Sequence, residues 1–139
     1  MEKLKSGKVN LIAGWLFVLL FFLLGWYLDA KIKQNAFSES LRLYLRRIHT
    51  HGLAFAMLNV LVGLCVDQSG LGKGAKRTAS LTAILGGILF PVGLFCRLCQ
   101  NSVHSGVVAG VLIHTGAILM ALSTLLLLIG FVTLPKETS

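Results

Sequence analysis

Four histidines are the residues of this sequence most able to do chemistry inside a membrane. His49, His51, His104 and His114 lie in or beside long apolar stretches, and His114 has no charged residue near it in the sequence. Placing an ionisable side chain in hydrocarbon costs free energy, so a functional role is the first hypothesis for such a residue. An imidazole at that depth is expected to be neutral, which is the form that ligates iron, zinc or copper.

The spacing of the histidines favours one pair as cofactor ligands. A b-type haem needs one or two imidazoles that project inward from facing helices. His51 and His114 are the best candidates, because they are expected near the same membrane face and differ modestly in depth; His49 and His104 are the alternates. His49 and His51 point about 200° apart on a helix, so they cannot easily share one metal ion. The alternative role for each histidine is a hydrogen bond to a backbone carbonyl across helices.

The short motif around the first two histidines also carries a resemblance. His49-Thr50-His51-Gly52 is similar to His-x-His patterns in haem-containing respiratory membrane subunits. The resemblance covers four residues, which is too few to assign the chain to a family. It implies haem ligation as one expectation.

Two cysteines form a C-x-x-C pair at the end of an apolar segment. In a soluble thioredoxin-like fold, such a pair opens a helix, whereas Cys96 and Cys99 follow a membrane segment. A zinc site would need a second pair of ligands, and Cys65 is expected alone at the opposite face. We interpret Cys96 and Cys99 as small apolar residues near the interface.

The acidic residues argue against enzymes and proton-coupled transporters. The sequence has five of them, and all fall in expected tails or loops: Glu2, Asp29, Glu39, Asp67 and Glu137. A proton-coupled transporter usually needs a buried carboxylate, and no soluble catalytic set is present. A small-solute transporter is therefore a distant third hypothesis.

Four apolar segments must position these side chains. Only 13% of the 139 residues are charged and 55% are hydrophobic, whereas about a quarter of a soluble domain is charged. Each segment is long enough to cross the hydrocarbon layer as a helix. We predict an all-α, four-helix membrane bundle that forms a single polytopic domain over residues 1–139, with spans near 10–28, 46–66, 80–98 and 104–134.

The residues before the second span show a different pattern. Between 36 and 48, apolar residues recur at helical spacing, and arginines occupy the other positions. This pattern predicts a short amphipathic helix at the interface, or an extension of the second span.

Small residues form two stripes at spacings of three or four, which is typical of closely packed membrane helices. The stripe in the second span holds Gly52, Ala56, Asn59 and Gly63. The stripe in the fourth span runs past His114 and holds Gly106, Gly110, Ala117 and Ala121.

The net charge of +8 sits in short basic runs at the ends of the apolar segments. Cations placed there meet lipid head groups and set topology, so we expect no nucleic-acid partner. The two membrane faces of the predicted bundle differ by one Lys or Arg residue. Because the first helix often dominates orientation, we expect both termini in the cytoplasm.

These observations leave two classes of function. The first is an accessory or assembly subunit of a larger membrane complex, for instance a respiratory one, without its own catalytic centre. Its expected partners are other membrane subunits or further copies of this chain in a homo-oligomer. The second is a redox protein that binds haem b or a metal through its histidines. The lack of a complete catalytic set in the sequence slightly favours the first class.

Overall fold

The computed structural model describes residues 6–34, 37–98 and 103–134, and it consists of four helices joined by short connections. They are α1 (Ser6–Lys33), α2 (Glu39–Cys65), α3 (Lys73–Leu98) and α4 (Val103–Val132). Helices of 26 to 30 residues are about 40–45 Å long, which exceeds the ~30 Å of a hydrocarbon core. All four are long and apolar enough to cross a membrane. The predicted all-α bundle is confirmed, and the described residues form no strand.

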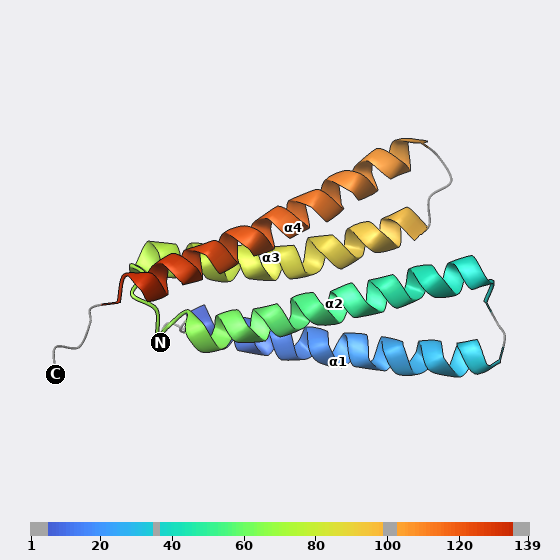
Figure 1. Cartoon of the computed structure of the whole chain (residues 1–139), viewed down its shortest axis with the longest axis horizontal. Helices are drawn as coiled ribbons and strands as arrows, with labels where there is room; N and C mark the ends of the chain where they lie inside the picture. The colour runs from blue at the N-terminus through green and yellow to red at the C-terminus, as the bar shows by residue number, and fades with distance from the viewer. Residues whose placement is uncertain (1–5, 35–36, 99–102, 135–139) are drawn as a thin grey trace.

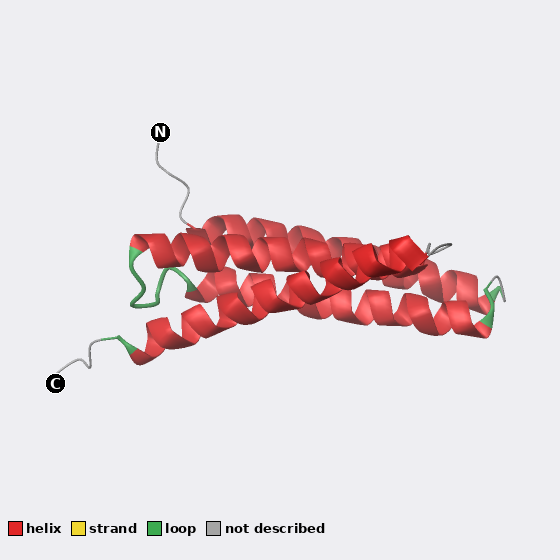
Figure 2. Cartoon of the chain, turned by 90° about the horizontal axis from the view of Figure 1, so that it is seen from above, coloured by secondary structure: helices red, strands yellow, loops and turns green. Residues whose placement is uncertain are grey.

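The helices are arranged as two antiparallel hairpins (Figure 1). α1 packs mainly on α2 and α3 mainly on α4, while α2 and α3 join the two hairpins. The hairpins diverge toward the end that holds the α1–α2 connection, and α4 runs obliquely to the other helices (Figure 2). We call this the open end. The first turn of α1 and the last turn of α4 lie together at the other end, which we call the terminal end.

Two apolar clusters hold the helices together, and α2 belongs to both. The cluster toward the terminal end joins α2, α3 and α4 through Val62, Val66, Ala79, Ala83, Met120 and Leu127. The cluster toward the open end is built by α1 and α2 through Phe21, Leu28, Leu45, Ile48 and Ala56. α4 takes part in the first cluster alone, which is consistent with its divergence from α2 toward the open end.

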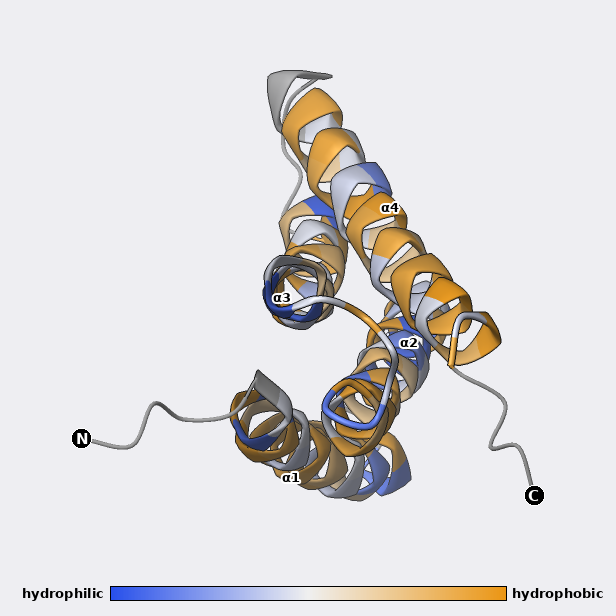
Figure 3. Cartoon of the chain, turned by 90° about the vertical axis from the view of Figure 1, so that its left-hand side faces the viewer, coloured by the Kyte–Doolittle hydropathy of each residue, from blue (hydrophilic) through white to orange (hydrophobic). Residues whose placement is uncertain are grey.

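The outward faces of α1 and α4 are apolar. On α1, side chains such as Trp15, Leu16 and Phe22 are more than half exposed, as are Val107, Ile118 and others on α4. Figure 3 shows apolar residues over most of α4, with hydrophilic residues mainly near helix ends. Exposure of these apolar faces to water would cost free energy, which indicates that lipid surrounds them.

The amphipathic segment before the second span is the first part of α2. The helix is continuous from Glu39 to Cys65, so the extension is correct and a separate interfacial helix is not formed. Leu45 and Ile48 are buried toward α1, while Arg46 and Arg47 are exposed. The buried apolar positions continue the face that α2 presents to α1, which explains why the helix does not break there.

Each hairpin contains a close backbone approach at a glycine. A Cβ atom placed on Gly116 of α4 would lie 2.6 Å from the backbone nitrogen of Phe90 in α3. A Cβ atom on Gly63 of α2 would lie 2.7 Å from the backbone nitrogen of Leu11 in α1. Only a residue without a side chain permits such an approach.

Candidate functional site

A groove between α2 and α4 ends about one helical turn from two of the candidate histidines, His51 and His114, which are not among the residues that line it. The groove has a volume of about 460 Å³ and is almost entirely apolar. Its walls are Phe55 and Leu58 from α2 and Ala117, Met120, Ala121, Thr124, Leu125 and Leu128 from α4. We call it the α2–α4 groove.

His51 extends the α2 wall of this groove by one turn toward the open end. It lies four residues before Phe55, so both side chains belong to the same face of α2. The His51 ring stacks on Phe90 of α3 at 5.7 Å between ring centroids, and Phe55 stacks on the same ring at 4.4 Å. Phe90 therefore forms the floor between α2 and α4.

His114 extends the α4 wall in the same direction. It lies three residues before Ala117, again on the face that lines the groove, and its side chain is exposed. Its depth is similar to that of His51, because both residues lie near Phe90 of α3. Gly116, two residues further along α4 than His114, lies against the Phe90 backbone, and the His51 ring stacks on the Phe90 ring. His51 and His114 therefore lie at a similar level on α2 and α4, about one turn beyond the residues that line the groove.

The hydrogen bonds of the two histidines fix which ring nitrogen is available. Nδ1 of His51 lies 2.8 Å from the carbonyl oxygen of Arg47, and Nδ1 of His114 lies 2.7 Å from that of Gly110. A carbonyl oxygen can only accept, so Nδ1 carries the proton and donates in both rings. The lone pair of each neutral ring is then on Nε2, which bonds to no group in the described part of the chain. This is the arrangement in which imidazoles ligate metals, with the other nitrogen held by a carbonyl.

His49 has a different environment from His51. Its Nδ1 donates to the carbonyl oxygen of Phe21 in α1 at 2.8 Å, and its ring covers Gly25. The two histidines therefore face different helices, as the 200° between them requires. His49 is not part of the α2–α4 groove. His104 lies in the first turn of α4, and its side chain lies outside the described residues.

The two stripes of small residues have different surroundings. In α2, Gly52 contacts Phe21 of α1, Gly63 lies against Leu11, and Ala56 and Asn59 are buried. This stripe packs against α1.

The α4 stripe requires a correction. A Cβ atom on Gly110 would meet no atom within 4 Å, so the close packing expected there does not occur in this chain. Gly106 is half-buried, and Ala117 and Ala121 line the α2–α4 groove. The close α3–α4 contact occurs instead at Gly116, on a neighbouring face of the helix. The course of α4 explains the difference, because α4 diverges from α2 toward the open end (Figure 1).

A buried polar cluster joins α1, α2 and α3 toward the terminal end. Asn10 and Asn59 are fully buried, and the Asn10 side-chain amide donates to Asn59 Oδ1 and to the carbonyl of Ser80, both at 3.2 Å. Ser80 donates its hydroxyl to Asn10, and Asn59 donates to the carbonyl of Ala83 at 3.0 Å. The small-residue pattern predicts Asn59 as a packing residue and gives no pairing with Asn10. The sequence did carry one signal for this cluster, because three of its apolar segments each hold a polar side chain, namely Asn10, Asn59 and Ser80.

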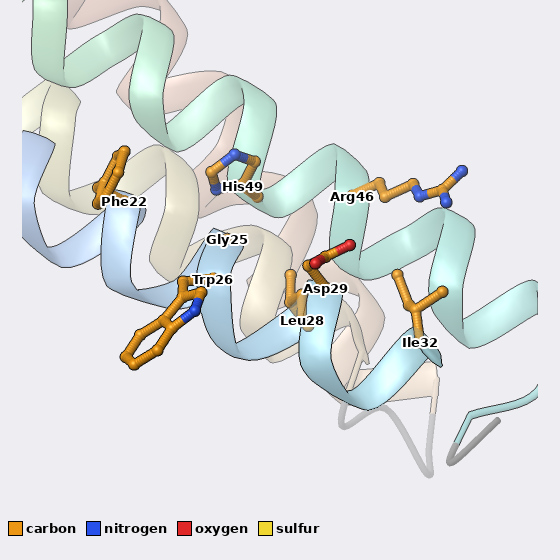
Figure 4. A pocket seen from close by; sticks show the side chains of 8 residues that line it. All are labelled: Phe22, Gly25, Trp26, Leu28, Asp29, Ile32, Arg46 and His49. Carbon is orange, nitrogen blue, oxygen red and sulfur yellow. The ribbon is translucent and has the colours of Figure 1, made fainter. Parts of the chain in front are cut away.

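A second cavity lies between the end of α1 and the start of α2, toward the open end. Its volume is about 430 Å³, and Figure 4 shows the eight residues that line it. Six come from α1 (Phe22, Gly25, Trp26, Leu28, Asp29 and Ile32) and two from α2 (Arg46 and His49). We call it the α1–α2 cavity.

The cysteines add no described site. Cys65 and Cys96 are half-buried free thiols, and Cys99 lies outside the described residues. No group of three or more histidine, cysteine or acidic side chains lies together within residues 6–34, 37–98 and 103–134.

Comparison with protein-family models, curated proteins and solved structures found no match to this chain.

Proposed function

We propose that this protein is a small multi-pass membrane protein that binds a histidine-ligated cofactor, with b-type haem as the best fit, between α2 and α4. The observation that carries the proposal is the pair of Nε2 lone pairs on His51 and His114, which lie about one turn beyond the residues that line the α2–α4 groove, on the same helix faces. In hydrocarbon, an unpaired nitrogen of this kind gains from a ligand, because no water is present to bond to it.

The surroundings of the pair suit a flat apolar macrocycle. Phe90 and Phe55 provide an aromatic floor and wall next to His51. Ala117 and Ala121 leave space on the α4 side. A bound haem would supply one-electron transfer, and the residues of the chain would hold it, orient its ligands and exclude water.

A visible absorption spectrum of the protein, purified from the membranes of its expression host with haem supplied, tests this proposal. We expect a Soret band and, after dithionite reduction, the sharp α band of a six-coordinate b-type haem. Metal analysis of the same sample distinguishes haem iron from a bare zinc or copper ion. A sample with neither haem nor a stoichiometric metal would overturn the proposal.

The second candidate is an accessory or assembly subunit of a larger membrane complex. The specific observation in its favour is that Ala117 and Ala121 face the groove rather than another helix of this chain. Small residues on an open groove allow a partner helix to approach closely, and the two Nε2 atoms would then accept hydrogen bonds from that partner. Recovery of a stable larger complex without any cofactor, disrupted by Ala117→Leu, would favour this candidate.

A further inference from the structure

The α1–α2 cavity changes in polarity along the helix axis. Its inner part is formed by Phe22 and Gly25 of α1, with the His49 ring of α2 against Gly25, and the buried Leu28 follows further out. Its outer part, nearer the α1–α2 connection, carries Asp29 and Arg46. Figure 4 shows Phe22 at one end of the lining, and Ile32 with the extended Arg46 side chain at the other. Ten residues of α1 separate Phe22 from Ile32, so the cavity follows the helix for about 15 Å.

This cavity crosses the boundary between hydrocarbon and head groups. Trp26 lines it and is 73% exposed, and tryptophan favours that boundary. Asp29 and Arg46 lie on the outer side of Trp26 together with the apolar Leu28 and Ile32, whereas Phe22 lies on the inner side. A molecule that filled the cavity would therefore need an apolar part and a polar part in this order.

The charges at the outer end select the sign of the polar part. Asp29 Oδ2 forms an ion pair with Lys33 Nζ at 2.7 Å, so its negative charge is already compensated. Arg46 lines the cavity without an ion-pair partner in the described part of the chain. The nearby helix ends carry more cations than acids: Lys31, Lys33, Arg42, Arg46 and Arg47 against Asp29 and Glu39. The outer end therefore has an excess of positive charge.

We propose that the α1–α2 cavity binds one acidic glycerophospholipid. Arg46 binds the phosphate, because a guanidinium matches two phosphate oxygens. One acyl chain lies along Phe22 and Leu28. His49 closes the inner wall, since its ring is held on α1 by the bond to the carbonyl of Phe21. This site is separate from the α2–α4 groove and does not depend on a cofactor there.

The test uses the full-length protein in a neutral detergent, stripped of endogenous lipid. Native mass spectrometry measures binding of dioleoyl phosphatidylglycerol, dioleoyl phosphatidylcholine and inorganic phosphate. We expect one phosphatidylglycerol to bind at least about tenfold more tightly than phosphatidylcholine, because a charge-assisted bond is made to Arg46. Phosphate alone should not bind, since it lacks the acyl chain that fills the inner part.

Two variants locate the site. Arg46→Gln should weaken phosphatidylglycerol binding about tenfold, whereas Arg47→Gln should have little effect, because the neighbouring Arg47 does not line the cavity. Arg46→Lys should bind with intermediate affinity, and circular dichroism checks that each variant is folded. Equal loss in the Arg46 and Arg47 variants, equal binding of both lipids, or competition by free phosphate would each overturn the proposal.

Discussion

At the scale of single residues, the three histidines with described side chains use the same atom in different ways. Each donates from Nδ1 to a backbone carbonyl, but His51 and His114 bond within their own helices and His49 bonds to α1. A bond within one helix only orients the ring, whereas a bond between helices also holds them together. This difference separates the two ligand candidates from a structural histidine.

Substitutions of these histidines should therefore have different effects. If the proposed haem is bound, His51→Ala and His114→Ala should each abolish or shift its spectrum, because each variant would remove a residue proposed to hold the haem. His49→Ala should keep the spectrum and lower the thermal stability, with a loss of about 1 kcal/mol for one hydrogen bond. Absorption spectra and melting temperatures of the three variants check this. An unchanged spectrum in His114→Ala would exclude that residue as a ligand.

The polar cluster leads to a second prediction at this scale. Asn59→Leu should destabilise the protein by about 1–3 kcal/mol, because Asn10 loses an acceptor in a fully buried position. The matched control is Leu61→Ala on the exposed face of α2, which should cost little. Thermal unfolding in one detergent compares the two. Equal stability of both variants would mean that the cluster contributes no net stability.

The sequence was sufficient to select His51 and His114 as candidates, since depth in an apolar run and separation along the chain can be read from it. It could not identify Phe90 as their floor, because that depends on the rotation of α3 about its axis. It also could not pair Asn10 with Asn59, because the partner of a buried amide is set by the register of two helices. Arg46 was assigned to the head-group region in general, and the α1–α2 cavity became visible only with both helices in place.

At the scale of helices, the number and approximate ends of the elements could be predicted because spanning length is a strong constraint. Both ends of α1 and the starts of α2 and α3 extend beyond the predicted spans, on residues such as Lys31 and Lys73, whereas the predicted fourth span runs two residues past the end of α4 at Val132. The packing face of α4 was the main error. α4 is apolar on nearly all sides, so small residues were the available guide to its contacts, and they occur on more than one face.

The corrected face of α4 can be tested with two glycine substitutions. Gly116→Leu should destabilise the α3–α4 hairpin by about 1–3 kcal/mol, because the side chain would meet the backbone of Phe90. Gly110→Leu should be tolerated by the monomer, because Gly110 faces open space. Melting temperatures in detergent measure both. If Gly110→Leu proved the more damaging change, α4 would have to be rotated or covered by a partner at that position.

At the scale of the whole molecule, the two hairpins place the start of α1 and the end of α4 at one end of the bundle (Figure 1). Because the number of spans is even, both ends of the chain lie on the same side of the membrane for either orientation of the bundle. The charges do not decide the direction strongly. Seven basic residues are assigned to the terminal side by their place in the sequence, namely Lys3, Lys5, Lys8, Lys73, Lys76, Arg77 and Lys136. Six belong to the open end, namely Lys31, Lys33, Arg42, Arg46, Arg47 and Arg97.

Reporter fusions at Met1 and Ser139 should accordingly give the same compartment, and we expect it to be the cytoplasm. The direction should be sensitive to few charges, because positive residues near the first helix usually dominate orientation. Replacing Lys3, Lys5 and Lys8 by glutamine leaves four basic residues at the terminal end against six at the other. This variant should move both reporters to the opposite compartment together, in at least part of the population. Reporters that respond independently, or that lie in different compartments in the unaltered chain, would contradict four spans and the common level of His51 and His114 that depends on them.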